Sequence, residues 1–305
     1  MLIYATEASA RHITPIGHPE RVDRVAAVER GLAGIPATRR ESPIADEADI
    51  LRCHPAHYLA RIKSAVPATG TAQLDPDTWM SPGSFEAASR AVGGACAAVD
   101  AVLDGDDTTA FVVARPPGHH AETETPMGFC LFGTVAIAAK KALTRLNRVA
   151  VVDFDVHHGN GTQELLWSEP RALFVTSQQM PLWPGTGDAS ERGAHGQILN
   201  LPLPPGSDGN HMRAAYEAQV FPALDAFKPE LILISAGFDA HADDPLANLN
   251  WQAADYAWLT RRLCDLAAKH AKGRVVSCLE GGYDLAALTA SVAAHVAVLQ
   301  ERSDG

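Results

Sequence analysis

Two aspartates and two histidines follow one apolar run in the stretch VAVVDFDVHHGNG (149–161). Asp155 and His157 are two residues apart, and side chains at i and i+2 of an extended segment point the same way. Asp239 stands just after another apolar run, LILISA (231–236), and offers a third ligand. Two carboxylates and one imidazole suit zinc or another first-row divalent ion, and three protein ligands leave a position open for water. The pattern therefore predicts a catalytic metal site.

A tandem pair, His119 and His120, ends the motif RPPGHH (115–120). The two prolines and the glycine before the pair favour a rigid, non-helical turn that holds both imidazoles at a fixed angle. Neutral imidazole near pH 7 is the usual general acid or base. Next to a metal site, the pair predicts acid–base catalysis, whereas paired histidines elsewhere can simply hydrogen-bond to the backbone.

Each of these residues has a simpler interpretation when it is taken alone. Asp155 could cap the following helix, and His157 could be a loop histidine with satisfied hydrogen bonds. An Asp-x-His unit, a second aspartate after a strand and a separate histidine pair together favour the metal site instead. Other isolated histidines are interpreted as packing or surface residues: His54, His57, His195, His211, His270 and His295.

Apolar runs alternate with helical patterns along the chain, which predicts strands joined by helices. Several runs are apolar at every position, which is typical of a parallel sheet covered on both faces. The expected strands are residues 2–5, 111–114, 149–154, 172–177, 198–203, 231–236 and 274–279. The expected helices are residues 84–103, 134–146, 212–227, 253–271 and 285–300. We therefore predict one three-layer α/β domain that covers residues 1–305.

Four of the expected strands run into polar, glycine-rich loops: RPPGHHAETETPMGFC, DVHHGNG, GFDAHADDP and EGGYD. In an open parallel sheet, ligands bind outside the carboxyl ends of the strands. The four loops should therefore meet at one rim of the sheet, and they predict a functional site there.

The overall composition narrows the classes of function. The chain has 305 residues, a net charge of -11 and five cysteines without a CxxC pair. The acidic balance argues against nucleic-acid binding and is compatible with a cationic substrate. The odd number of cysteines argues against a disulfide framework. Because we find neither a signal-peptide pattern nor an uncharged apolar run of about 20 residues, we expect a cytoplasmic protein without a membrane span.

Seven motifs occur in a fixed order along the chain: HPERVDRV (18–25), RPPGHH, GFC, DFDVHHGNG, PGTG (184–187), SAGFDAHADDP and LEGGY. In this order they resemble the histone deacetylase family, and the resemblance covers about residues 18–300. It is to the class II-like bacterial branch of deacetylases and acetylpolyamine amidohydrolases. It implies an arginase-like open α/β fold, in which about eight parallel strands lie between helices.

The resemblance also implies a role for the motif residues. The ligands of a single catalytic zinc ion would be Asp155, His157 and Asp239. His119 and His120 would form the general acid–base pair, and Tyr283 would donate a hydrogen bond to the oxyanion. Asp153 and Asn160 would be hydrogen-bond partners of the two histidines. Part of the family has an aspartate in place of Asn160, so His120 is expected to be less basic here.

Further residues match the family's substrate channel. Phe129 and Trp183 would form its aromatic walls, beside Gly128, and Asp77 at the rim could hold the substrate backbone. Arg21 matches an arginine in the cavity through which acetate leaves. A structural potassium ion would be bound, partly through main-chain oxygens, by Asp153, Asp155, His157, Thr176 and Ser177.

Two positions depart from the family pattern. The family usually reads GFCxFNN, but this chain has GFCLFGT, so Gly133 and Thr134 replace two amides and alter the packing behind the site. Leu246 is expected at the channel, where eukaryotic polyamine deacetylases place a glutamate that binds the distal ammonium. Leu246 therefore argues against that mode of polyamine recognition.

The implied reaction is hydrolysis of an N-acyl amide, most simply acetyl-lysine in proteins or peptides. Acetylpolyamines or other small acylated amines remain an alternative substrate class, and the oligomeric state stays open. A two-metal ureohydrolase would need more carboxylates than the segment His158-Gly159-Asn160 supplies. A non-catalytic acyl-lysine binding module is disfavoured because Tyr283 and both histidines of the pair are present.

Overall fold

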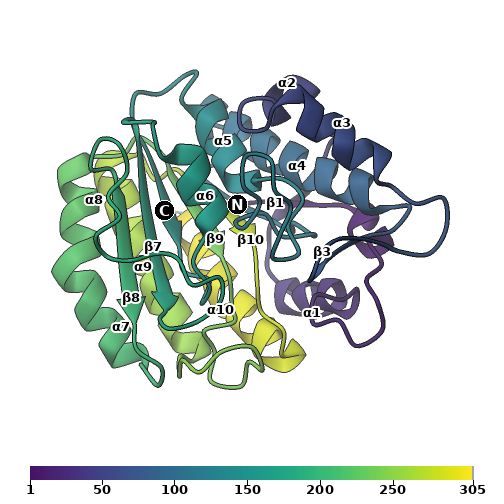
Figure 1. Cartoon of the computed structure of the whole chain (residues 1–305). Helices are drawn as coiled ribbons and strands as arrows, with labels where there is room; N and C mark the ends of the chain where they lie inside the picture. The colour runs from purple at the N-terminus through teal and green to yellow at the C-terminus, as the bar shows by residue number, and fades with distance from the viewer. Residues whose placement is uncertain (304–305) are drawn as a thin grey trace.

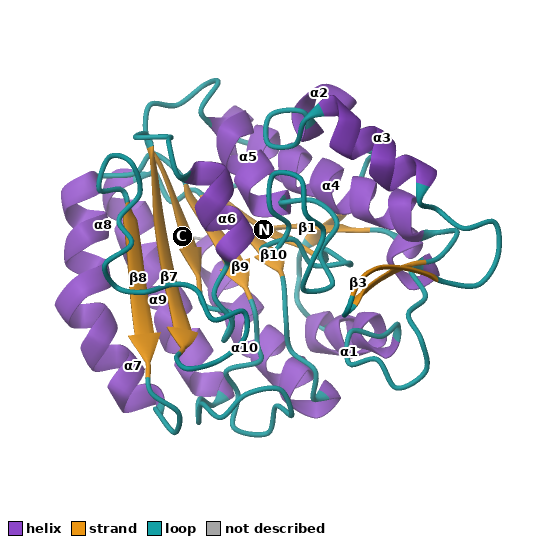
Figure 2. Ribbon diagram, in the orientation of Figure 1, coloured by secondary structure: helices purple, strands orange, loops and turns teal. Residues whose placement is uncertain are grey.

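The fold is an open sheet of eight strands, described for residues 1–303 by a computed structural model (Figure 1, Figure 2). The strand order is β2-β1-β5-β10-β9-β6-β7-β8, and every neighbouring pair is parallel. The strands are β1 (Leu2–Ala5), β2 (Thr38–Glu41), β5 (Thr109–Val112), β6 (Val149–Asp153), β7 (Ala172–Gln179), β8 (Ile198–Leu203), β9 (Ile232–Ala236) and β10 (Val275–Leu279). The open parallel α/β architecture predicted from the sequence is confirmed.

Helices cover both faces of this sheet (Figure 2). They are η1 (Glu7–Arg11), α1 (Asp23–Leu32), α2 (Glu47–Ile50), α3 (Ala56–Ser64), α4 (Ser84–Asp104), α5 (Thr134–Ala142), α6 (Asn160–Leu166), α7 (Gly209–Ala215), η2 (Tyr216–Val220), α8 (Phe221–Phe227), α9 (Ala253–His270) and α10 (Leu285–Ser303). Leu2 and Tyr4 of β1 belong to an apolar core with α4 and α5, whereas Ile3 belongs to a second core with α1, α9 and α10. Burial on both faces explains why successive strand residues are apolar.

The four strands that precede the glycine-rich loops, β5, β10, β9 and β6, are neighbours in the middle of the sheet. Their carboxyl ends lie at the same edge because all four run in the same direction. The loops that follow them, residues 113–133, 280–284, 237–252 and 154–159, therefore meet at one rim. This arrangement is the expected one for a ligand site in an open parallel sheet.

Some elements differ from the sequence-based expectation. Strand β2 was not predicted, because its sequence TRRE is polar and it lies exposed at the edge of the sheet. A short antiparallel hairpin, β3 (Ala72–Asp75) and β4 (Thr78–Met80), was also missed. The strand expected at 111–114 is shifted, since β5 ends at Val112. The helices before residue 65 were not predicted either, although α1 and α3 each bury an apolar face.

All five cysteines are buried and free, in line with the expectation of no disulfide framework. Burial raises the pKa of Cys53 to about 12, so that thiol stays protonated and unreactive at neutral pH. Within residues 1–303, no helix combines the length and the apolar character needed to cross a membrane.

Candidate active site

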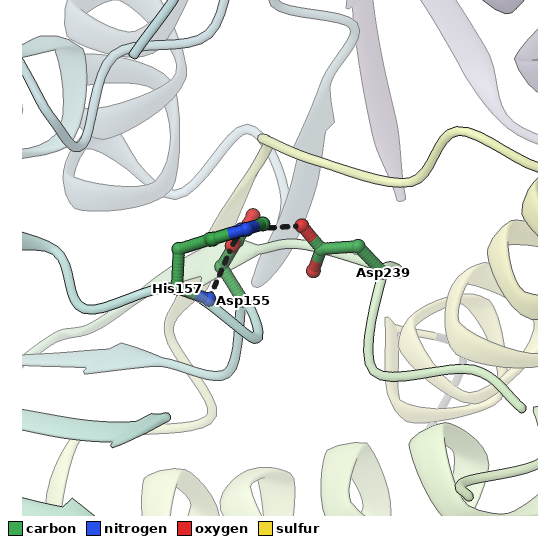
Figure 3. Close-up of side chains that lie close together, drawn as sticks. All are labelled: Asp155, His157 and Asp239. Atoms are coloured by element: carbon green, nitrogen blue, oxygen red, sulfur yellow. Dashed lines mark hydrogen bonds and ion pairs between the residues drawn. The ribbon is translucent and has the colours of Figure 1, made fainter. Parts of the chain in front are cut away.

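The three predicted metal ligands come together at the carboxyl ends of β6 and β9 (Figure 3). His157 Nδ1 lies 3.2 Å from Asp155 Oδ1 and 3.1 Å from Asp239 Oδ2. All three side chains are buried, and their ligand atoms lie within 4.8 Å of one another. Among residues 1–303, this is the one group of histidine, cysteine and carboxylate side chains with metal-site geometry.

Backbone hydrogen bonds fix the two carboxylates. Asp239 Oδ1 accepts a hydrogen bond from the Val156 amide at 2.8 Å, and Asp155 Oδ2 accepts one from the Gly281 amide at 2.9 Å. Glycine is required at two places by this close approach. A Cβ atom on Gly237 would lie 2.1 Å from Asp155 Oδ2, and one on Gly281 would lie 2.3 Å from Asp239 Oδ2. The loops after β9 and β10 can therefore approach the carboxylates only because they carry glycine.

The two carboxylates of the ligand group bring negative charge into the protein interior. Asp155 and Asp239 are both 0% exposed, and their ion-pair partners are histidines, with no lysine or arginine of residues 1–303 among them. Burial and the nearby Asp155 carboxylate raise the pKa of Asp239 to about 7. A divalent cation relieves such repulsion, and zinc accepts this set of oxygen and nitrogen donors. The residues present therefore fit a zinc ion.

The tandem histidines lie side by side above the ligand group. Their ring centroids are 3.9 Å apart, and the His120 ring is 6.0 Å from the His157 ring. His119 Nδ1 lies 2.9 Å from Asp153 Oδ2, whereas His120 Nδ1 lies 2.7 Å from Asn160 Oδ1. The structure thus pairs each histidine with the partner expected from the sequence.

The surroundings shift the pKa values of the two imidazoles in opposite directions. Burial alone would lower the pKa of His119, but the Asp155 and Asp153 carboxylates outweigh it and raise that pKa well above its usual range. Burial, with the positive fields of His119 and His157, lowers the pKa of His120 well below its usual range. His120 is therefore the neutral member of the pair, suited to accept a proton.

Glu280 holds the turn that carries the histidines, a contact that the sequence analysis missed. Its Oε2 atom accepts hydrogen bonds from the Gly118 amide at 2.7 Å and the His119 amide at 3.2 Å. Burial raises the pKa of Glu280 to about 7. The position of Glu280 inside the LEGGY motif was visible in the sequence, but its contact with another strand's loop was not.

Tyr283, in the loop after β10, lines one cavity together with His120 and His157. Its amide donates to Asp244 Oδ2 at 2.7 Å, and Gly282 before it adopts a φ of 117°, which favours glycine. Burial, with the charges of Asp239 and Asp155, raises the pKa of the Tyr283 phenol well above its usual range. The phenol therefore keeps its proton and can donate a hydrogen bond.

A cavity of about 230 Å³ leads to these groups. Its lining includes the channel residues expected from the sequence, together with Leu182, which was not predicted: Asp77, His120, Gly128, Phe129, His157, Leu182, Trp183, Leu246 and Tyr283. A Cβ atom on Gly128 would lie 2.4 Å from the His120 ring, so a glycine is needed for the wall to pass this close.

A larger, charged cleft of about 870 Å³ opens beside β2, but its arginines are already paired with carboxylates, as Arg39 is with Glu29.

The hairpin β3–β4 supports one wall of this channel. Asp77 Oδ1 accepts a hydrogen bond from the Gly128 amide at 3.1 Å, and Thr78 Oγ1 accepts one from the Phe129 amide at 3.1 Å. The His18 ring packs edge-on against the Phe129 ring at 4.8 Å, and its Nε2 atom lies 3.0 Å from the Asp77 carbonyl oxygen. Asp77 thus shapes the wall through one carboxylate oxygen.

Arg21, expected in the acetate cavity, lies at the surface of the structure. Its side chain is 50% exposed and pairs with Asp23. The buried arginine is Arg24, whose Nε atom donates to the Gly282 carbonyl at 2.7 Å. Its guanidinium also lies 5.2 Å from the centre of the Tyr283 ring. Arg24 lies in the first turn of α1 and is fully buried, whereas Arg21 precedes the helix.

Of the residues predicted to bind potassium, Asp155 and His157 belong to the ligand group, and the other three are buried as well. Asp153 of β6 pairs in register with Thr176 of β7, and both are fully buried. The Ser177 hydroxyl lies 2.8 Å from the Tyr216 hydroxyl. Potassium binding here stays a prediction.

A profile of the histone deacetylase domain matches residues 18–299, and the motifs that carry the site fall inside this range. The chain belongs to the histone deacetylase family. An uncharacterized protein of Synechocystis is 43% identical over 95% of this chain and 96% of its own length. The histone deacetylase-like amidohydrolase of Pseudomonas aeruginosa is 42% identical over 80% of this chain and 66% of its own length.

The fold comparison agrees with this family. The crystal structure of the HDA15 HD domain superimposes with a TM-score of 0.92 at 29% sequence identity, covering 98% of this chain and 90% of that one. Histone deacetylase family membership supports a hydrolase with deacetylase or amidohydrolase activity. The predicted family and its fold are thus confirmed.

Proposed function

We propose that this histone deacetylase family member is a zinc-dependent amidohydrolase that removes acetyl groups from acetyl-lysine side chains of proteins or peptides. The observation that carries the proposal is that His157, of the three-ligand group, lines the same narrow cavity as His120 and Tyr283. A cavity of this size and aromatic lining suits a slim acyl-lysine chain. We treat residues 1–305 as one catalytic domain.

Asp155, His157 and Asp239 would hold the zinc ion. When bound, zinc would polarise the acyl carbonyl and make a nearby water molecule more acidic. His120 lines the cavity and is neutral, so its Nε2 atom would take a proton from the water that attacks the carbonyl. The protonated phenol of Tyr283 would donate a hydrogen bond to the developing oxyanion.

The leaving amine would receive a proton from one of the two histidines. His120 lines the cavity while His119 lies behind it, so we assign this step to His120. His119, held by Asp153, would stay cationic and add positive charge near the reacting carbonyl. Both histidines would thus contribute, one through proton transfer and one through its charge.

The apolar side chain of Leu246 supports acetyl-lysine over acetylpolyamines. Leu246 lines the mouth of the cavity and offers no charge to a distal ammonium group. We also propose that potassium binds at the site predicted above. The chain would act in the cytoplasm, and its substrates would be acylated amines rather than nucleic acid.

The test is a comparison of kcat/KM for an acetyl-lysine peptide, acetylputrescine and acetylspermidine with the zinc-loaded protein. We expect the peptide to be hydrolysed with the highest kcat/KM. Faster turnover of either polyamine would overturn the assigned substrate class, and release of acetate from none of the three would overturn the proposed function.

A further inference from the structure

The side-chain amide of Asn160 is held at both of its ends. Its Oδ1 atom faces His120 Nδ1 at 2.7 Å. Its Nδ2 atom lies 2.8 Å from Glu122 Oε1 and 3.4 Å from Met127 Sδ. Asn160 is 6% exposed, so protein atoms rather than solvent satisfy the hydrogen bonds of its amide.

The chemistry of these neighbours allows the amide only one orientation. A carboxylate and a thioether accept hydrogen bonds and donate none. The NH₂ group of Asn160 must therefore face Glu122 and Met127, which leaves the amide oxygen facing His120. An oxygen accepts, so His120 Nδ1 must carry the proton, and the lone pair of the neutral ring lies on Nε2.

The opposite orientation would disable His120 as a base. It would bring the Asn160 oxygen against the Glu122 carboxylate and aim the NH₂ group at His120 Nδ1. Nδ1 would then have to accept, and the single proton of the neutral ring would move to Nε2. His119 has no such ambiguity, because either oxygen of its partner Asp153 accepts a hydrogen bond.

We propose that Glu122 is a positioning residue that orients the Asn160 amide and, through it, sets the tautomer of His120. The inference rests on the proposed function, in which His120 Nε2 takes a proton from water. It also explains how this chain works with an amide where part of the family has a carboxylate.

The contact is built into the packing of two loops. Glu122 lies two residues after His120, and its amide donates to the Thr125 carbonyl at 3.0 Å. A Cβ atom on Gly161 would lie 2.3 Å from the Ala121 carbonyl oxygen, so the start of α6 presses against this loop. The half-buried Glu122 side chain is thereby held beside Asn160.

A double-variant cycle tests the inference: it compares the wild type, Glu122→Ala, Asn160→Asp and the double variant, with a further variant as control. With Asn160 present, we expect Glu122→Ala to lower kcat about tenfold, which is part of the rate that a general base contributes. KM and zinc content should stay unchanged. In the Asn160→Asp background the new carboxylate accepts through either oxygen. There we expect Glu122→Ala to leave kcat unchanged or raise it, because a like charge is removed. Glu122→Gln is the matched control, since its own oxygen can accept from Asn160, and it should stay within about threefold of the wild type.

A spectroscopic measurement reads the tautomer without any substrate. In ¹⁵N spectra of histidine-labelled protein, assigned with a His120→Gln variant, His120 should carry its proton on Nδ1 in the wild type and in Glu122→Gln. Glu122→Ala should show a mixture of tautomers. An unchanged tautomer in Glu122→Ala, an equal kcat loss in both backgrounds or a Gln variant as slow as Ala would each overturn the inference. A wild type that shows the Nδ1 tautomer but hydrolyses no acyl amine would overturn the proposed function instead.

Discussion

The floor of the cavity and its mouth are built differently. At the floor His157 lines the cavity, and the ligands Asp155 and Asp239 beside it are buried and held by backbone amides from the loops after β6 and β10. At the mouth, Trp183 is 41% exposed, and Leu246 lies in a loop. The ligands directly follow the strands and are tied down by backbone amides, whereas the Trp183 side chain at the mouth is exposed to solvent. Changes in the floor should therefore lower kcat, and changes at the mouth should mainly raise KM.

The largest effect is expected from Asp239→Asn, which removes a charge from the floor. Losing one of two carboxylate ligands should empty the zinc site and lower kcat/KM about a thousandfold or more, equivalent to roughly 4 kcal/mol. Elemental analysis and initial rates check this. Asp243→Asn, at a carboxylate that is 75% exposed, is the matched control and should keep both zinc and activity. A fully active Asp239→Asn protein would contradict the assignment of the floor.

Tyr283→Phe should separate catalysis from metal binding. Removing one oxyanion donor typically costs about 10²–10³ in kcat, so turnover should fall by that factor while zinc content and KM stay close to wild type. Steady-state kinetics on an acetyl-lysine peptide give the result. Near-wild-type kcat would show that the phenol does not stabilise the oxyanion.

Trp183→Ala should affect the mouth rather than the floor. The indole packs 4.7 Å from the His120 ring and offers apolar surface to the substrate's methylenes. Its loss should raise KM about tenfold, equivalent to roughly 1.4 kcal/mol, with a smaller change in kcat. Trp167→Ala, at an exposed tryptophan outside the cavity, should leave KM unchanged. A fall in kcat alone would contradict the division between floor and mouth.

His295 provides a smaller effect, on stability rather than on catalysis. Burial lowers its pKa to about 3, and its ring is held between the Thr260 and Ser277 hydroxyls at 2.6 Å and 2.8 Å. The unfolded chain binds the proton more readily, so stability from the neutral ring is present above about pH 6.5 and is lost as the pH falls toward 3. His295→Gln should flatten the fall in unfolding free energy between pH 6.5 and 5 by up to about 1.4 kcal/mol per pH unit.

Urea unfolding at several pH values measures this slope. His57→Gln, at a histidine side chain that is 70% exposed, is the control and should leave the slope unchanged. An identical slope for His295→Gln and the wild type would show that His295 does not resist protonation in the folded protein.

The floor could be predicted from the sequence because strand ends and i, i+2 spacing place its ligands locally. The same reasoning gave the sheet, since strands such as β6 and β9 are apolar throughout. It missed β2, whose polar residues tolerate an exposed edge. It named Arg21 from the motif match, because the sequence alone does not say that Arg24 is the buried arginine of the two. Contacts between loops of different strands, such as those of Glu280 and Glu122, leave no local pattern in the sequence.

The most direct test of the account is the metal content of the active protein. Elemental analysis of purified protein should give one zinc ion per chain, and dialysis against a strong chelator should abolish release of acetate from an acetyl-lysine peptide. One equivalent of zinc should restore the activity in the wild type, but not in Asp239→Asn. Full activity in protein shown by the same analysis to lack a divalent metal would contradict the account.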